Sequence, residues 1–295
     1  MVTTLTSRRR LVASTLMLLA GCTGFTRDRS PGSLTTEQIA AILASADRPA
    51  ADRTNDLRRK PEQMLAFLAI RPGMTALDVS AGGGYTTELL ARAIGPTGAV
   101  YGQRPTPRNA SLPAAGPAQP EGDSRPGIAQ APRSASPPPA GPRNPAAPIT
   151  DRDARLRNSG VPAAPMIPVI QPFENPVPAA VADGRLDLVT LMFNYHDMGH
   201  LGVDRAAMNR AIFRALRPGG AYVIADHAGR AGTGISESGT LHRIEETFLR
   251  KEVEGAGFRL IEEGTFLRNP NDPRNLNTPE PAQPKDEFVL KFVKP

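Results

Sequence analysis

Residues 73–103 read GMTALDVSAGGGYTTELLARAIGPTGAVYGQ, and this stretch decides the fold. The short apolar run at 74–79 predicts a buried strand, and the three glycines at 82–84 predict a tight turn directly after it. The spacing of leucine and isoleucine over 85–94 predicts a helix, and a second apolar run follows at 99–101. A strand, a helix and a second strand in this order form a right-handed crossover whose two strands are parallel.

The same alternation returns in the second half of the chain. The apolar patterns there predict three helices and five strands, the last two of which close the sheet: helices at 151–158, 204–216 and 241–255, and strands at 166–170, 186–193, 221–225, 258–261 and 288–293. Two earlier helices are predicted, one behind the capping box of Thr35 and Gln38 and one starting at Pro61. We therefore predict an α/β fold with a doubly wound, mostly parallel, Rossmann-like sheet.

A change of composition interrupts this domain. Residues 105–148 contain 13 prolines and no aromatic residue, so they cannot bury enough apolar surface to offset the entropy of ordering. We predict a disordered Pro-rich insertion over 104–148. The folded domain then comprises 33–103 and 149–295.

The N-terminus carries the pattern of an export signal. Three arginines, 8–10, precede an apolar run at 11–19 that is too short to span a bilayer. Small residues then precede Cys22, the only cysteine, and this resembles the lipobox of bacterial lipoproteins. We predict a signal peptide at 1–21, lipidation of Cys22 and a tether at 22–32, on an exported protein held at the cell envelope and facing the periplasm. A chance cysteine behind a generic signal peptide, and twin-arginine export, remain open.

Composition excludes several classes of protein. The chain has 295 residues, 40 % of them hydrophobic, which is enough for a substantial core. A single cysteine excludes an internal disulfide and a multi-cysteine zinc site. Three of the charges behind the formal net charge of +6 belong to the N-terminal arginines, so we expect no nucleic-acid partner. Membrane contact is expected through the lipid alone.

The glycine turn has the features of a ligand site. Ligands of such sheets bind outside the carboxyl ends of the strands, where glycines let the backbone come close. Gly82 and Gly84 allow this approach, the amides that open the helix at Tyr85 are donors, and Asp78 is an acceptor. The alternative is a strand-to-helix connection that is closely packed and binds nothing.

At this point the sequence resembles the class I S-adenosylmethionine-dependent methyltransferases. Three motifs carry the resemblance in order and spacing: LDVSAGGGY at 77–85, ALRPGG at 215–220 and GAGF at 255–258. Three more resemble a group of bacterial exported predicted methyltransferases: NYHD at 194–197, LGVDRAAMNR at 201–210 and TLHRI at 240–244. The resemblance covers about residues 40–103 and 150–295.

The resemblance implies S-adenosylmethionine as the cofactor. It implies that the amino-acid part of the cofactor lies against Asp78, Ala81, Gly82, Gly83, Gly84 and Tyr85, with Asn194 at the neighbouring strand end. Gln103 is then the ribose ligand and Glu174 the adenine ligand. Two departures stand out, because Ser80 replaces the first glycine of the family motif and Gln103 replaces a carboxylate. One amide oxygen accepts fewer hydrogen bonds than a carboxylate, which predicts weaker binding or a different geometry.

Two His/Asp pairs follow neighbouring strands and should meet at one crevice. Histidine titrates near neutral pH and a carboxylate can orient it, so it suits the removal of a proton from a methyl acceptor. We predict His196, Asp197 and His227 as catalytic residues. The predicted substrate-binding residues are Tyr195, Asp226, His242 and Arg243. Hydrogen-bonded structural roles are the alternative for all of these.

A metal site is a further alternative. His196 and His200 are four residues apart and could bind a divalent ion together with Asp226 and His227. This needs a helix between the first two histidines, where Met198-Gly199 indicates a loop. We therefore predict no metal.

Two functions of different class follow. The first is methyl transfer from S-adenosylmethionine to an unidentified small molecule, by a lipid-anchored exported protein. The second is a non-catalytic envelope lipoprotein that keeps the fold as a binding or structural module. The second is favoured by the cytoplasmic origin of S-adenosylmethionine, and the first by the two His/Asp pairs.

Overall fold

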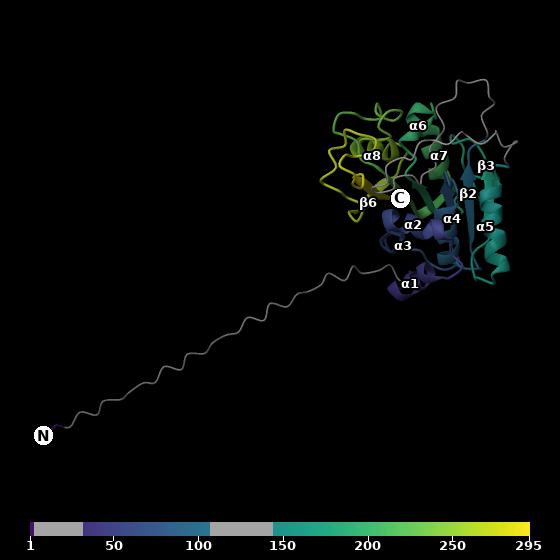
Figure 1. Ribbon diagram of the computed structural model, residues 1–295, viewed down its shortest axis with the longest axis horizontal. Helices are drawn as coiled ribbons and strands as arrows, with labels where there is room; N and C mark the ends of the chain where they lie inside the picture. Colours follow the sequence, from purple (N-terminus) through teal and green to yellow (C-terminus); the bar gives the residue numbers. More distant parts are fainter. Residues whose placement is uncertain (3–31, 107–143) are drawn as a thin grey trace.

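The computed structural model describes residues 1–2, 32–106 and 144–295 (Figure 1). The lipidation site Cys22 lies outside the described residues, as do all but the first two residues of the predicted signal peptide, nearly all of the tether and most of the Pro-rich insertion. Within the described ranges, no helix combines the length and the apolar character needed to cross a membrane.

A seven-stranded sheet organises the domain, and it confirms the predicted doubly wound α/β fold. The spatial order is β3-β2-β1-β4-β5-β7-β6. The strands from β1 to β5 pair in parallel, while β7 is antiparallel to both β5 and β6. Their bounds are β1 Thr75–Val79, β2 Ala99–Arg104, β3 Met166–Ile170, β4 Leu186–Met192, β5 Leu216–His227, β6 Arg259–Gly264 and β7 Glu287–Val293.

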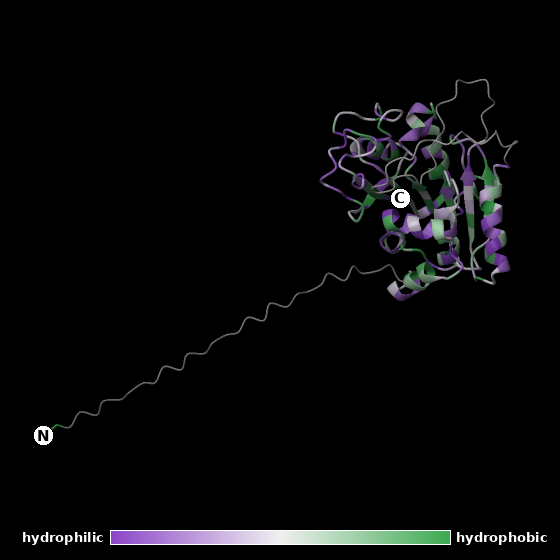
Figure 2. Ribbon diagram, in the orientation of Figure 1, coloured by the Kyte–Doolittle hydropathy of each residue, from purple (hydrophilic) through white to green (hydrophobic). Residues whose placement is uncertain are grey.

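Helices cover both faces of this sheet. They are α1 Thr36–Ala44, α2 Ala50–Arg59, α3 Pro61–Leu68, α4 Tyr85–Ile94, α5 Ala147–Asn158, α6 Asp197–His200, α7 Arg205–Ala215 and α8 Glu246–Glu254, with a 3-10 turn η1 at Ala179–Val181. Those with one buried face, such as α5, carry both hydrophobic and hydrophilic residues along their length (Figure 2).

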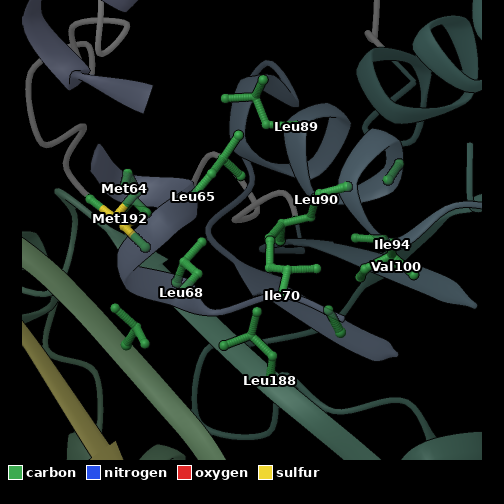
Figure 3. Close-up of a cluster of buried hydrophobic side chains, with 14 of the residues drawn as sticks. Met64, Leu65, Leu68, Ile70, Leu89, Leu90, Ile94, Val100, Leu188 and Met192 are labelled. Atoms are coloured by element: carbon green, nitrogen blue, oxygen red, sulfur yellow. The ribbon is translucent and has the colours of Figure 1, made fainter. Parts of the chain in front are cut away.

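Alternation along the strands divides the core into two clusters. Ala76 and Leu188 pack with α1, α3, α4 and α5, and Figure 3 shows part of this cluster around Leu68, Leu90 and Ile94. The next residues along the two strands, Leu77 and Val189, point to the other face and pack with α7 and α8. Successive strand side chains point to opposite faces, so each strand is buried on both sides, as a parallel sheet requires.

The element boundaries differ from the sequence prediction at the places that matter for the site. Helix α5 begins at Ala147, inside the predicted insertion. Strand β2 extends past the apolar run at 99–101 and ends at Arg104, one residue beyond the predicted end of this part of the domain at 103. The residues after His196 form the short helix α6, where a loop was predicted. His242 and Arg243 do not open a helix, because α8 begins only at Glu246 and Ile244 instead bridges to Ala228 after β5.

Candidate active site

The glycine turn after β1 is open at its centre and closed at its end. Gly82 and Gly83 are exposed, and a Cβ added at Gly83 would meet no described atom within 4 Å. At Gly84 an added Cβ would lie 2.9 Å from Cδ of Arg152 and 3.1 Å from Cδ1 of Ile149. Two glycines therefore offer an open backbone, and the third, Gly84, is needed for the packing of α5.

Three other residues predicted at the cofactor hold the turn in place. The carboxylate of Asp78 is buried and accepts hydrogen bonds from Oγ1 of Thr87 (2.7 Å) and of Thr190 (2.8 Å). The backbone N–H of Ala81 donates to the carbonyl of Gln103. The hydroxyl of Tyr85 donates to Asp56 of α2, and burial together with this bond raises the pKa of Tyr85 well above its usual range.

The structure corrects the prediction that Gln103 contacts the ribose of the cofactor. The side chain of Gln103 is fully buried, its Oε1 accepts from the backbone N–H of Ser80 at 2.9 Å, and its Nε2 donates to the carbonyl of Gln171 at 2.7 Å. Both ends of the amide are therefore used inside the protein. The bond to Ser80 satisfies a residue with φ +58°, a conformation that is costly without glycine. Glu174, the predicted adenine ligand, is half-buried in the loop after β3, and its role stays a prediction.

A chain of side-chain contacts leads from this turn to the histidines. Oγ of Ser80 donates to Oδ1 of Asn194 at 2.7 Å, and Nδ2 of Asn194 donates to Oδ2 of Asp197 at 2.9 Å. Oδ1 of Asp197 lies 3.0 Å from Nε2 of His196 and 2.7 Å from Nδ1 of His242. The ends of β1 and β4 and the loop before α8 are thereby joined in one polar site.

His196 is paired across the sheet with Asp226, at the end of β5. Nδ1 of His196 lies 2.6 Å from Oδ1 of Asp226, and both residues are buried. Burial opposes the charge of His196, but the carboxylates of Asp226 and Asp197 outweigh it and raise the pKa of His196 to about 10. A raised pKa favours the charged imidazole and so disfavours uptake of a further proton from an acceptor. The geometry of His196 between two carboxylates therefore favours a positioning role over the predicted role as a base.

The pKa values of Asp197 and His227 are both lowered, in contrast to the raised pKa of His196. Burial would raise the pKa of Asp197, but the hydrogen bonds of His196 and His242 hold it well below its usual range. Burial, reinforced by nearby cations such as Lys285, lowers the pKa of His227 well below its ordinary value. His227 is therefore a neutral imidazole beside the charged one of His196, with ring centres 5.2 Å apart.

Glu287 of β7 is a member of the site that sequence reasoning missed. Its Oε1 lies 3.0 Å from Nδ1 of His227 and 2.9 Å from Nη1 of Arg58. Burial raises the pKa of Glu287 to about 7, although Arg58 opposes the shift. Nothing in the strand pattern around Glu287 marks it. The charged stretch at 47–60, which contains Arg58, was the one available signal for its partner.

Two residues predicted to bind substrate are structural. Tyr195 is fully buried, where its hydroxyl donates to Glu252 and accepts from Asn209, between α7 and α8. Arg243 is also fully buried and pairs with Asp272 at 2.8 Å. Neither side chain reaches the crevice. Of the other two predicted substrate-binding residues, Asp226 is buried and contacts His196. His242 faces solvent at the site, with 40 % of its side chain exposed.

Comparison with known proteins concerns the fold. No protein-family model and no curated protein matches the chain. Among solved structures, an S-adenosylmethionine-dependent methyltransferase from Aquifex aeolicus aligns with a TM-score of 0.50 at 16 % identity, covering 89 % of this chain and all of the other. The [4+2]-cyclase SpnF aligns with a TM-score of 0.50 at 15 % identity, covering 85 % of this chain and 86 % of the other. At this level of identity, the likeness establishes that the chain has the class I methyltransferase fold.

Proposed function

We propose that the protein binds S-adenosylmethionine at the glycine turn and transfers its methyl group to a small-molecule acceptor beside His227. One observation carries this proposal. The open backbone at Gly82 and Gly83 belongs to the same turn as Ser80, from which side-chain contacts lead through Asn194 and Asp197 to the imidazoles of His196 and His242.

The turn fits the cofactor at its amino-acid end. Exposed backbone at Gly82 and Gly83, in a space that a side chain would fill, suits the close approach of a carboxylate and an amine. The part of the site predicted to bind the ribose fits less well, because both polar atoms of the Gln103 side chain are already hydrogen-bonded within the protein. Ser80, Gly82, Gly83 and Asn194 are therefore the residues that would hold the group, which supplies an electrophilic methyl when bound.

The histidines and Glu287, across the site from the glycine turn, differ in charge and are proposed to have different roles. Neutral His227 can accept the proton that a hydroxyl or amine acceptor loses, and Glu287 next to it titrates near neutral pH and can take the proton onward. His196, clamped between Asp226 and Asp197, fixes the shape of this wall of the crevice. A cavity of about 20 Å³, lined mostly by apolar side chains such as Met64, Leu65 and Phe193, adjoins this wall, because the ring of Phe193 lies 5.7 Å from that of His227. Its volume is about that of one water molecule.

Calorimetry with S-adenosylmethionine tests the site, with Gly83→Asp as the decisive variant. The new carboxylate enters the open space above the turn without strain, since Gly83 has no positive φ. There it repels the carboxylate of the cofactor, so we expect binding to weaken about 30-fold or more. Gly84→Asp is a poorer test, because its side chain collides with Arg152.

Gln63→Glu is the matched control, because it adds the same charge at an exposed position of α3. It should leave binding unchanged. Equal binding by Gly83→Asp moves the cofactor away from the turn. Absence of binding by the wild-type protein removes the proposal and leaves the non-catalytic envelope module, the function that the internal bonds of Gln103 favour.

Export and a lipid anchor on Cys22 are part of the proposal. They are supported by the arginines at 8–10, the short apolar run at 11–19 and the small residues before the single cysteine. Cells fed a fatty-acid probe should label the protein, and Cys22→Ala should abolish the label and release the protein from the membrane fraction. Undiminished labelling of Cys22→Ala contradicts the anchor.

A further inference from the structure

Three side chains of the polar site, those of His196, Asp197 and His242, bring one possible metal-ligand atom each close together. Nε2 of His196 and Nδ1 of His242 lie 3.0 Å and 2.7 Å from Oδ1 of Asp197. One ligand atom from each of the three residues lies within 4.8 Å of the other two. His196 and Asp197 come from the start of α6, and His242 from the loop before α8. Two imidazoles and one carboxylate are a common ligand set for divalent transition ions.

Asp226 fixes the direction in which His196 presents its donor. It accepts from Nδ1 of His196 at 2.6 Å and is itself held by the backbone N–H groups of His196 and His227. The ring therefore turns Nε2 toward Asp197. A carboxylate behind a histidine, on the side away from the ion, is the usual outer-shell support of a metal ligand.

The backbone holds His242 at the cluster. His242 has φ +51°, which is costly for a residue other than glycine and persists only where the surroundings impose it. The neighbouring Arg243 is fully buried, and Ile244 bridges to Ala228, so both anchor the loop. The imidazole of His242 stays 40 % exposed, which leaves a path for an ion from solvent.

We propose that His196, Asp197 and His242 bind a divalent transition-metal ion of the zinc class through Nε2, Oδ1 and Nδ1. Bonds of about 2.0–2.1 Å in a tetrahedral site separate the donor atoms by roughly 3.3 Å. Oδ1 of Asp197 lies 3.0 Å and 2.7 Å from the two nitrogens, so on ion binding it would recede from each by about 0.3–0.6 Å. The three donor atoms lie within 4.8 Å of one another, so the two nitrogens would move toward each other. Three protein ligands leave a fourth position for water or for an oxygen of a substrate.

This ligand set differs from the one that the sequence indicated. Nδ1 of His200 lies 3.0 Å from Oγ of Ser238 and 3.8 Å from Oδ1 of Asp197, further from that oxygen than the two proposed nitrogens. Asp226 lies behind His196, and His227 faces Glu287. The site does not depend on the proposed methyl transfer, because binding is measured directly.

The test is a titration of the chelator-treated full-length protein with Zn²⁺ in competition with a chromophoric chelator. We expect one Zn²⁺ per chain. His242→Asn tolerates the positive φ and removes the imidazole, and it should weaken binding by about 100-fold or more, while Asp226→Asn weakens it by about 10–100-fold. His200→Gln is the control, a neighbouring imidazole that is not a proposed ligand, and it should bind like the wild type.

Circular dichroism of the metal-free variants establishes that each is folded. Cobalt(II) gives a second readout, because its visible spectrum should change in His242→Asn and not in His200→Gln. The proposal is overturned by a wild-type protein that binds no Zn²⁺, by unchanged binding in a folded His242→Asn, or by equal losses in His242→Asn and His200→Gln.

Discussion

Arg243→Met is expected to lower the free energy of unfolding by about 3–5 kcal/mol, because it leaves a buried carboxylate without its cation. Arg243 has 0 % exposure and Asp272 has 5 %. The guanidinium lies 2.8 Å from Asp272 and also donates to the carbonyls of Ala228 and Leu276. Methionine keeps most of the volume and supplies none of these donors. Urea denaturation followed by circular dichroism, at fixed pH and salt, measures the loss.

Arg250→Met is the control for removing an arginine as such. Arg250 pairs with Glu254 at 3.1 Å on the exposed side of α8, and its loss should cost no more than about 0.5 kcal/mol. Adding Asp272→Asn to Arg243→Met should recover part of the stability, because the uncompensated charge is then gone. A loss below about 1 kcal/mol in Arg243→Met contradicts the structural role and reopens its prediction as a substrate ligand.

The parts of the fold that local sequence determines were predictable. The order of strand, glycine turn and helix after residue 73 follows from the spacing of apolar residues and from the glycines within 73–103. The structure confirms this order. The closing strands β6 and β7 were predictable for the same reason. The start of α5 was not, because Ala147 follows a stretch whose composition signals only the absence of a core.

The pairing inside the site depends on strand register, which the sequence does not show. Sequence neighbours indicated the pairs His196–Asp197 and Asp226–His227. His196 does contact Asp197, but the register of β4 and β5, which sets Met192 opposite Ala225, also brings His196 against Asp226 and leaves His227 facing Glu287. His242 reaches the same place because Ile244 bridges to Ala228, a contact between distant parts of the chain. The proposed ligand set therefore becomes apparent only in the folded molecule.

Glu287→Gln is expected to remove a pH dependence of stability of about 3 kcal/mol between pH 4.5 and 7. Burial raises the pKa of Glu287 from its ordinary value of 4.5 to about 7, so the folded chain keeps this proton to higher pH than the unfolded chain. The stability that the protonated carboxyl contributes is complete below pH 4.5 and is lost as the pH rises through 7. Glutamine does not titrate. The stability of Glu287→Gln relative to the wild type should therefore increase across this window, as measured by urea denaturation at a series of pH values.

The comparison must be made as a difference between proteins, because His227 acts in the opposite direction. Its depressed pKa means that stability is lost as the pH falls below its ordinary value of 6.5, in the wild type and in Glu287→Gln alike. Glu263→Gln, at an exposed position of β6, is the control and should change stability by less than about 0.5 kcal/mol throughout. A constant difference between Glu287→Gln and the wild type across the window means that Glu287 is charged at neutral pH and simply pairs with Arg58. A carboxylate that is already ionised in the resting protein and held by Arg58 has a low affinity for protons, and the proposed passage of a proton from His227 to Glu287 then fails.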